Sequence, residues 1–490
     1  MSKIEVNEID KQNGSTLTIG GSGTTVQLGT GASQTGFGRT GTVDWQTGSI
    51  KTTTFVAANG EGYFVNTSGG AVTMTLPASP SAGNIVSVKD YAYSFATHNL
   101  TVGRNGSPIG GLSSDDVTYS TNGTALTFIY VDGTKGWLVI NESTDTSEGE
   151  APAYVTASGG NATLTVGDFK THVFTGPGTF TVSCAGNARG SNKVDYFVVG
   201  GGGSGGAPHH NGSGAGGGGA GGFRVSNSSG CIAAPLMSPL IAPACSPGRA
   251  VSAQGYPIVV GGGGAGVTSP PSTYQSGNNG IASSFNGISS AGGGAGSGGN
   301  SNCHPAGSGG SGGGSGYNTR ACAAHGQGNT PSVSPPQGED GGSNSPNTSG
   351  SYAAAAGGGA GAAGGTSPAN NVGGTGGAGS FVAESFFGPT ASSYGTPGPV
   401  SSTRYFAGGG GGGGGISSPY PGGPITGGPG GAGGGGQGGG DPAPSRPGVA
   451  GTTNTGGGSG GGSSNYSPPQ VGNSLAGGPG FVAIRYKFQN

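Results

Sequence analysis

The chain has 490 residues, of which 121 are Gly and 32 are Pro, and its 17 basic and 19 acidic residues leave a net charge of −2. The Gly residues stand in blocks such as 408–415 and not at every third position, which excludes a collagen triple helix. No Lys lies between Lys193 and Lys487, so the chain lacks the basic stripe of a nucleic-acid-binding protein and we expect no nucleic-acid partner.

Residues 1–48 are predicted to form an attachment segment and a β shaft. Residues 1–10 carry four charges and no apolar segment, so no export signal is visible and we expect synthesis in a cytoplasm. In 15–48, apolar residues such as Leu17 and Ile19 alternate with small ones between Gly turns. Strands this short need stacking against other copies of the chain, which indicates a thin, trimeric shaft.

Residues 49–142 are predicted to form a β domain. Two apolar runs, 125–131 and 137–140, flank the turn Asp132-Gly133, as in a β-hairpin. Two more alternating strands are predicted at 72–76 and 85–89, and Trp137 is expected in the core. The segment that follows is acidic and has no apolar side chain, so 143–153 is predicted to be a linker.

A second, small β unit is predicted at 154–199, with a hairpin over 171–182 around Gly176-Pro-Gly178. Its last strand, 194–199, leads directly into the first Gly block, and another strand, 481–488, directly follows the last one. A flexible tail has no need of a closing strand. We therefore expect 200–490 to be a folded glycine-rich domain closed by strand 481–488.

The Gly blocks have two interpretations. Gly loses the most backbone entropy on ordering, so the blocks could be flexible linkers. Alternatively, they form polyproline-II helices, which have three residues per turn and no internal hydrogen bonds. Without side chains, such helices can approach closely enough to hydrogen-bond laterally, which gives a polyglycine-II bundle. The aromatic and apolar residues in the spacers favour the bundle. The expected fold class is therefore all-β in the amino-terminal part, then a glycine-rich polyglycine-II bundle, with almost no α-helix.

The borders of the Gly blocks resemble a known family. The run 194–203, the segment 216–224, the motif 282–288 and the ending 478–489 are similar to the glycine-rich domain of tail-fibre and other virion proteins of marine bacteriophages, especially those that infect cyanobacteria. Segment 42–52 and the residues around Gly176 are similar to the amino-terminal parts of the same proteins. The bundle is also similar in principle to the distal adhesins of T-even-like phages, in which loops at the tip contact the host receptor.

This resemblance implies a virion tail fibre that is extracellular after lysis. The implied partners are other copies in a homotrimer, virion proteins at the amino terminus, and a host surface glycan (lipopolysaccharide) or outer-membrane protein. Two alternatives stay open. One is a non-adhesive virion decoration or capsid fibre, and the other is a cell-surface filament, which the missing export signal disfavours.

If successive Gly blocks alternate in direction, every second spacer lies at the tip remote from the shaft. These spacers are 207–213, 267–291, 317–355, 380–407 and 441–455. Tyr and Arg are frequent at binding hot spots, so these loops are the predicted receptor-contact surface. The candidate contact residues are Tyr274, Tyr317, Arg320, Tyr352, Phe386, Phe387, Tyr394, Arg404 and Tyr405, together with His209, His210 and His325. Each aromatic could instead wedge loops together, and Phe285 is the clearest such core residue.

The sequence offers little for catalysis. Carboxylates in the Gly region are few and scattered, and no Gly-Lys-Ser/Thr phosphate loop occurs, so no enzyme activity, catalytic residue or cofactor is expected. Cys303, His304, Cys322 and His325 match zinc-ligand spacing only loosely, so no metal site is expected. Loop-stapling disulfides between Cys231 and Cys245 and between Cys303 and Cys322 are predicted instead.

Overall fold

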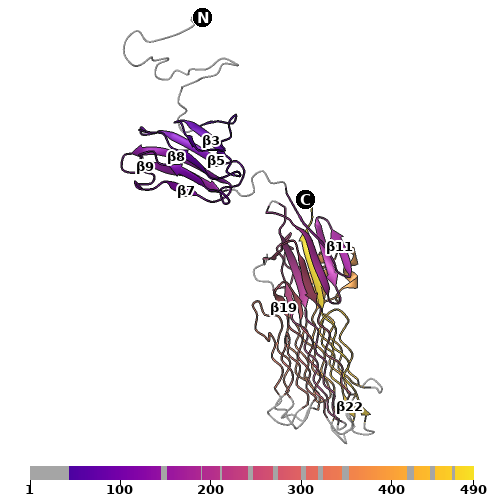
Figure 1. Ribbon diagram of the computed structural model, residues 1–490. Helices are drawn as coiled ribbons and strands as arrows, with labels where there is room; N and C mark the ends of the chain where they lie inside the picture. Colours follow the sequence, from indigo (N-terminus) through magenta and orange to yellow (C-terminus); the bar gives the residue numbers. More distant parts are fainter. Residues whose placement is uncertain are drawn as a thin grey trace, which may run out of the picture. The chain divides into compact units, whose positions relative to one another are not determined.

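Extended chain dominates the computed structural model (Figure 1). It describes residues 43–144, 152–188, 190–209, 212–240, 247–268, 274–298, 305–317, 324–344, 352–416, 424–441, 447–465 and 470–489. Within these ranges the only helices are two short 3-10 turns, η1 (Glu384–Phe386) and η2 (Gly388–Ser393), which confirms the expected all-β class. None of the described helices has the length and apolar character needed to cross a membrane. Most of the predicted attachment segment and shaft, residues 1–48, lies outside the described residues.

Contacts divide the chain into two units, Met1–Glu150 and Ala151–Asn490. The first unit has two sheets. One sheet has the strand order β1 (Asp44–Trp45), β3 (Glu61–Val65), β5 (Ile85–Asp90), β8 (Thr124–Asp132) and β9 (Gly136–Thr144). The other has the order β2 (Phe55–Val56), β4 (Val72–Thr75), β6 (Leu100–Gly103) and β7 (Val117–Tyr119). From β1 to β6 the chain alternates between the sheets, so neighbouring strands in this part are parallel.

Side chains from both sheets form the core of the first unit. Trp137, Phe128 and Met74 are fully buried in one cluster. The predicted hairpin is confirmed, because β8 and β9 pair antiparallel around the turn at Asp132–Gly136. The core position of Trp137 is confirmed as well.

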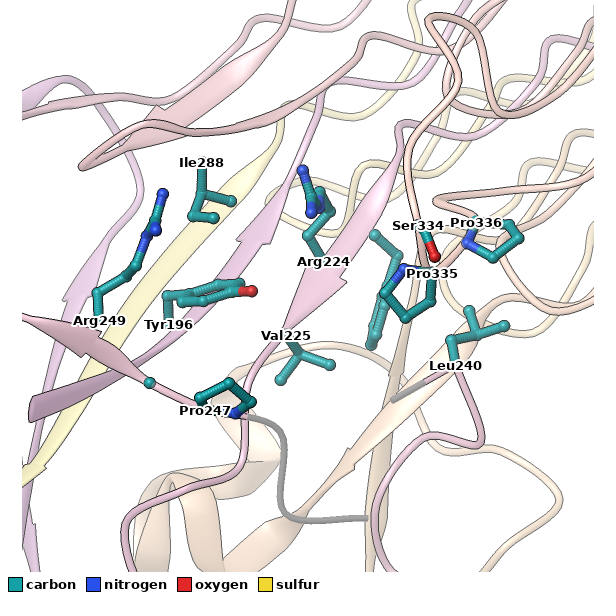
Figure 2. A pocket seen from close by; sticks show the side chains of 12 residues that line it. Tyr196, Arg224, Val225, Leu240, Pro247, Arg249, Ile288, Ser334, Pro335 and Pro336 are labelled. Carbon is teal, nitrogen blue, oxygen red and sulfur yellow. The ribbon is translucent and has the colours of Figure 1, made fainter. Parts of the chain in front are cut away.

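The second unit contains a six-stranded sheet and a five-stranded sheet. The six-stranded sheet has the order β11 (Ala162–Val166), β12 (Phe169–Phe174), β24 (Phe481–Lys487), β14 (Lys193–Val199) and β15 (Phe223–Val225), and β16 (Arg249–Ala250) also pairs with β14. Figure 2 labels Tyr196 of β14, Val225 of β15 and Arg249 of β16. The five-stranded sheet has the order β10 (Val155–Ser158), β13 (Gly178–Ala185), β17 (Gly255–Val259), β18 (Ser283–Phe285) and β19 (Ile288–Ser290). Phe285 is fully buried in the core between them, as expected.

The predicted hairpin over 171–182 is wrong in its pairing. Both strands form, as β12 and β13, but they belong to different sheets. β12 pairs with β11 and β24, and β13 pairs with β10 and β17. The turn around Gly176 therefore carries the chain from one sheet to the other, because Phe174 and Phe180 on its two sides are both buried in the core between the sheets.

The strands that bracket the Gly region lie side by side. β14 and β24 pair antiparallel, with Val199 opposite Phe481. Both strands are buried on their two faces, which agrees with their nearly continuous apolar sequences. The chain thus leaves and re-enters the sheet at adjacent points, and the Gly region between them is a closed structure.

Within that region the chain forms extended segments, here called rods, and the central rod is residues 214–222. Its nine backbone N–H groups donate with a period of three, at N···O distances of 2.8–3.1 Å. The pairs are Gly214 to Tyr352, Ala215 to Gly462, Gly216 to Ser297, Gly217 to Ala355, Gly218 to Ser459, Gly219 to Gly294, Ala220 to Gly358, Gly221 to Gly456 and Gly222 to Ala291. Positions three apart reach the same neighbouring rod, which is the signature of three residues per turn.

The carbonyl groups of the central rod follow the same period toward three other rods. These are 200–206, 311–317 and 410–413. The central rod therefore has six hydrogen-bonded neighbours, three as donor and three as acceptor. This is the lateral pairing expected for polyglycine-II packing, and it accounts for every N–H group of the rod.

Close approach of backbones explains why these rods are made of Gly. A Cβ added to Gly217 would overlap the carbonyl oxygen of Gly410, and one added to Gly218 would overlap that of Gly203. Side chains are thus excluded at most rod positions by the neighbouring rod itself. Gly is needed here because the absence of a side chain lets the rods approach each other, and its conformational freedom is secondary.

Ser residues that interrupt the blocks take part in the pairing. Ser204 Oγ accepts from the backbone N of Asn278 at 2.8 Å, and Ser459 Oγ accepts from the N of Gly205 at 2.9 Å. Both side chains are fully buried. A hydroxyl oxygen thus replaces a backbone acceptor, so the interruptions do not break the bundle.

The rods have two ends. At the sheet end they join the strands, as Gly200 and Gly480 do next to β14 and β24. The opposite, far end lies at Ala207 and Gly214, and the hairpin of β22 (Ser464–Asn465) and β23 (Gln470–Val471) is found there (Figure 1). Loops between rods therefore gather at these two ends.

Candidate functional site

Two aromatic rings stack at the far end where the first rod ends. Ala207 and Gln275 exchange both backbone hydrogen bonds, at 2.8 and 3.1 Å, which brings two rods together. His209 and Tyr274 lie just beyond this bridge, and their rings stack at a centroid distance of 5.0 Å. Both side chains are half-buried, so one part of the stack remains accessible.

A second stack is held by the end of the central rod. Gly214 accepts from the backbone N of Tyr317 at 3.0 Å and donates to the carbonyl of Tyr352 at 2.8 Å. The two Tyr rings stack at 4.7 Å with an angle of 14° between their planes. The stack thus depends on a residue with no side chain, which joins two tyrosines that are far apart in the sequence.

The two stacks are neighbours. Burial is the main cause that raises the pKa of Tyr317 to about 12, followed by the proximity of Tyr352, a hydrogen bond with it, and the proximity of Tyr274. The Tyr317 phenol is therefore protonated throughout the physiological pH range. We call His209, Tyr274, Tyr317 and Tyr352 the aromatic tip.

The aromatic tip has the chemistry of a recognition surface for uncharged, hydroxyl-rich ligands. Aromatic faces pack against apolar C–H groups, and phenol hydroxyls both donate and accept hydrogen bonds. Tyr also contributes a large contact area at low entropic cost. Among the predicted contact residues, His209, Tyr274, Tyr317 and Tyr352 are those that the structure brings together at this end.

The prediction that 380–407 lies at the tip is wrong. This segment is at the sheet end, where β20 (Ser380–Ala383) pairs with β21 (Thr403–Phe406). Phe386 and Phe387 are fully buried, and Phe386 packs edge-on against Phe197 of β14 at 6.3 Å.

Tyr394, Arg404 and Tyr405 share this location. The Arg404 guanidinium donates to the carbonyls of Tyr394, Ser392 and Gly395, and its residue is only 7% exposed. Tyr405 is buried, and Tyr394 packs on the same core as Phe387. These residues stabilise segment 380–407 where it packs against the sheet, and they are poorly placed to contact a partner.

The error comes from counting one rod for each Gly block. The Gly-poor segment 275–281 forms a complete rod, in which Gln275 pairs with Ala207 at the far end. Segments 324–329 and 337–343 also lie in the bundle, and block 356–365 turns back on itself through a bond from Gly359 N to Ala362 O. No local signal in the sequence marks these extra passes, because most of their hydrogen bonds join backbone groups of segments that are far apart in the chain.

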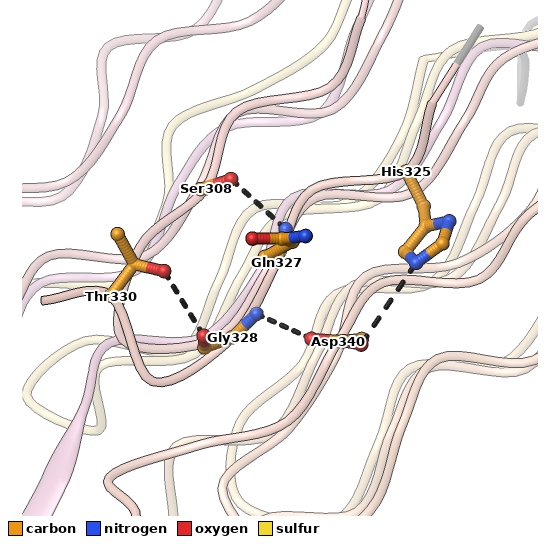
Figure 3. A network of polar contacts seen from close by, with 6 residues as sticks. All are labelled: Ser308, His325, Gln327, Gly328, Thr330 and Asp340. Carbon is orange, nitrogen blue, oxygen red and sulfur yellow. Dashed lines mark hydrogen bonds and ion pairs between the residues drawn. The ribbon is translucent and has the colours of Figure 1, made fainter. Parts of the chain in front are cut away.

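Among the described residues, no other predicted contact residue joins the tip. His210 and Arg320 lie outside the described residues. His325 Nε2 is 3.9 Å from Asp340 Oδ2, and this contact is an ion pair only when His325 is protonated (Figure 3). Asp340 also accepts from the backbone N of Gly328 at 2.7 Å, so this network ties two adjacent rods together.

Only one of the four cysteines in the predicted disulfides lies among the described residues. Cys231 is disulfide-bonded, but Cys245, Cys303 and Cys322 lie outside the described residues, so both predicted pairings stay predictions. Cys184 is a free, exposed thiol. Within the described ranges, no three His, Cys, Asp or Glu side chains converge as metal ligands would.

The family comparison agrees with the extent of the second unit. A family model described as a glycine-rich domain matches residues 174–487, from the end of β12 to the end of β24. No curated protein matches the chain.

Proposed function

We propose that this chain, which belongs to the glycine-rich domain family, is a bacteriophage tail-fibre protein that binds the host cell surface through the aromatic tip. The rods act as a rigid stalk, and the tip supplies the contacts. In this proposal the ligand is a surface glycan such as the sugar part of lipopolysaccharide. Display of several copies on one fibre multiplies weak contacts.

The observation that carries the proposal is the convergence of His209, Tyr274, Tyr317 and Tyr352 at one end of the bundle. The stacks are spaced 5.0 and 4.7 Å within each pair and are anchored by backbone bonds to Gly214 and Ala207. A core role would favour full burial, yet all four rings stay partly exposed. The similarity of the block borders to virion proteins supports the same conclusion.

Binding of the labelled full-length protein to a panel of bacterial cells tests the proposal. We expect Tyr317→Ala together with Tyr352→Ala to weaken binding at least tenfold, because aromatic hot spots contribute about 2 kcal/mol or more each. Tyr317→Phe keeps the ring and should retain most of the binding. Tyr91→Ala is a matched control, since Tyr91 is 55% exposed in the first unit.

Two further outcomes separate the alternatives. Binding that survives protease treatment of the cells but is lost with truncated lipopolysaccharide identifies a glycan, and the reverse identifies an outer-membrane protein. If no cell in the panel binds the wild type, or if the double variant binds equally well, the tip is not an adhesin and a non-adhesive fibre becomes the better description.

A further inference from the structure

A second candidate site lies at the sheet end, on the edge of β14. Val198 of β14 is paired with Arg224, and Val194 is paired with Arg249. Residues that alternate along a strand face the same side, as do directly paired residues on adjacent strands. Tyr196 stands between the two valines. Arg249, Tyr196 and Arg224 therefore form a row on one face (Figure 2).

A pocket of about 450 Å³ opens along this row. Such a volume lies within the range of about 300–1,000 Å³ that is usual for small-molecule sites. Pro247, Leu240 and Pro335 contribute apolar walls, and Ser334 adds a hydroxyl group. The pocket thus combines cationic and hydroxyl donors with apolar surface, the combination that fixes the orientation of a small polar ligand.

The two arginines of the pocket have no acceptor in the part of the chain that the structure describes. Neither guanidinium makes a hydrogen bond or an ion pair with another described residue, and the Nε of Arg249 is buried without any partner. The nearest acid along the strand, Asp195, points away and is fully buried. It accepts hydrogen bonds from Ser226, Ser228 and Ser229.

Unpaired, partly buried guanidinium groups are unusual, because burial of a cation is costly unless an anion or hydrogen-bond acceptor compensates it. The Gly region has few Arg and no Lys, so placing two Arg around one Tyr is not a general property of its surface. The guanidinium fork binds carboxylates and phosphates in two-point geometry.

We propose that this pocket binds an acidic sugar, with the carboxylate or phosphate held between Arg224 and Arg249 and the ring against the proline wall. Tyr196 lies between the two arginines in the row and lines the same pocket, so its hydroxyl can bond the same ligand. This site is at the opposite end of the bundle from the aromatic tip, and the inference does not depend on the proposed adhesin function.

Calorimetric titration of the full-length protein with D-glucuronate, glucose 6-phosphate and glucose tests the proposal. At least one anionic sugar should bind about tenfold or more tightly than glucose, because only an anion forms charge-assisted, two-point hydrogen bonds with a guanidinium. Comparison of the two anions distinguishes a uronate site from a phosphosugar site. Raising the ionic strength should weaken anion binding.

Substitutions locate the binding on the molecule. Arg224→Gln and Arg249→Gln should each weaken binding of the tighter anion about tenfold or more, whereas Arg104→Gln, in the first unit, should leave it unchanged. If a Gln variant is unfolded, Arg249→Lys keeps the charge without the fork and should still bind more weakly, with an unchanged melting temperature.

The opposite results overturn the inference. Equal binding of glucose and both anions, no binding of either anion, or unchanged affinity in the folded arginine variants would each do so. Tyr317→Ala should not affect this titration, so failure of the pocket and failure of the aromatic tip are distinguishable.

Discussion

Extended chain is stabilised in opposite ways in the first unit and in the glycine bundle. In the first unit, large side chains such as Trp137 and Phe128 fill the space between two sheets, and Gly133 has nothing within 4 Å of where its Cβ would lie. In the bundle, the interior is backbone, and a Cβ on Gly217 would strike the neighbouring rod. Stability thus depends on the side chains present in one region and on their absence in the other.

Adding a single methyl group to the central rod should destabilise the protein more than any other change considered below. Gly217→Ala places its Cβ against the backbone of Gly410, which cannot move without breaking its own bonds to adjacent rods. We expect a cost above the 1–3 kcal/mol usual for overpacking, enough to prevent native assembly of the bundle. Calorimetry and limited proteolysis of the second unit measure this.

Gly176→Ala is the matched control for that change. Gly176 belongs to the same unit, but nothing lies within 4 Å of its added Cβ. Its melting temperature should stay close to that of the wild type. Equal stability of the two variants would show that the rods are not packed as closely as described.

In the first unit, deletion of a side chain should be the damaging change. Trp137 is fully buried, so Trp137→Ala should cost about 3–5 kcal/mol through the cavity that it leaves. The only other Trp in the chain is Trp45, which lies in the same unit and reports its unfolding by fluorescence in urea. Leu112→Ala, at a residue that is 58% exposed, should shift the midpoint little.

Two buried serines test whether hydroxyls in the rods replace backbone acceptors. Ser459 Oγ accepts from Gly205 N at 2.9 Å and donates to the carbonyl of Leu475 at 2.6 Å, so Ser459→Ala should destabilise the bundle by about 1–3 kcal/mol. Ser311 Oγ is buried with no partner among the described residues, so Ser311→Ala should be neutral or slightly stabilising. Thermal unfolding compares them, and the reverse order would contradict this assignment.

The smallest expected effect is a loss of folding stability at high pH, caused by ionisation of Tyr317 in the aromatic tip. The folded state raises the pKa of Tyr317 from its ordinary value of 10.0 to about 12. Its protonated form therefore favours the folded state below pH 10, and this contribution is lost as the pH rises through 12. A tyrosinate absorbance titration should lose one late-ionising group in Tyr317→Phe, and Tyr352→Phe should lower the pKa of Tyr317. An unchanged titration in both variants would mean that the rings are not stacked.

In the first unit, β4, β5, β8 and β9 were predicted because their signals are local, whereas the parallel pairing of the strands from β1 to β6 was not predicted. The hairpin of β8 and β9 is marked by its turn, and Trp137 by its place in an apolar run. The hairpin over 171–182 shows the limit of such signals. Both of its strands were found, but their partners come from residues far along the chain, such as β24 and β17.

The candidate site was predictable only in part. Tyr274, Tyr317 and Tyr352 were expected at the tip, whereas Phe386 and Phe387 were placed there by a count of rods that the turn at Gly359–Ala362 invalidates. The row of Arg224, Tyr196 and Arg249 was not predicted at all. Its members are brought together by the shared edge of β14 and have no common motif.

The sequence by itself predicted a chain that is extended and nearly free of helix, and the apolar spacers and bracketing strands favoured laterally paired glycine rods over flexible linkers. Only the tertiary structure decided which rods are neighbours and which loops lie at each end. The physical reason is that pairing between glycine rods uses identical N–H and C=O groups at every position. A rod without side chains presents the same backbone groups toward each of its six neighbours. Distant strands, turns and a few buried hydroxyls therefore decide which rods lie next to one another.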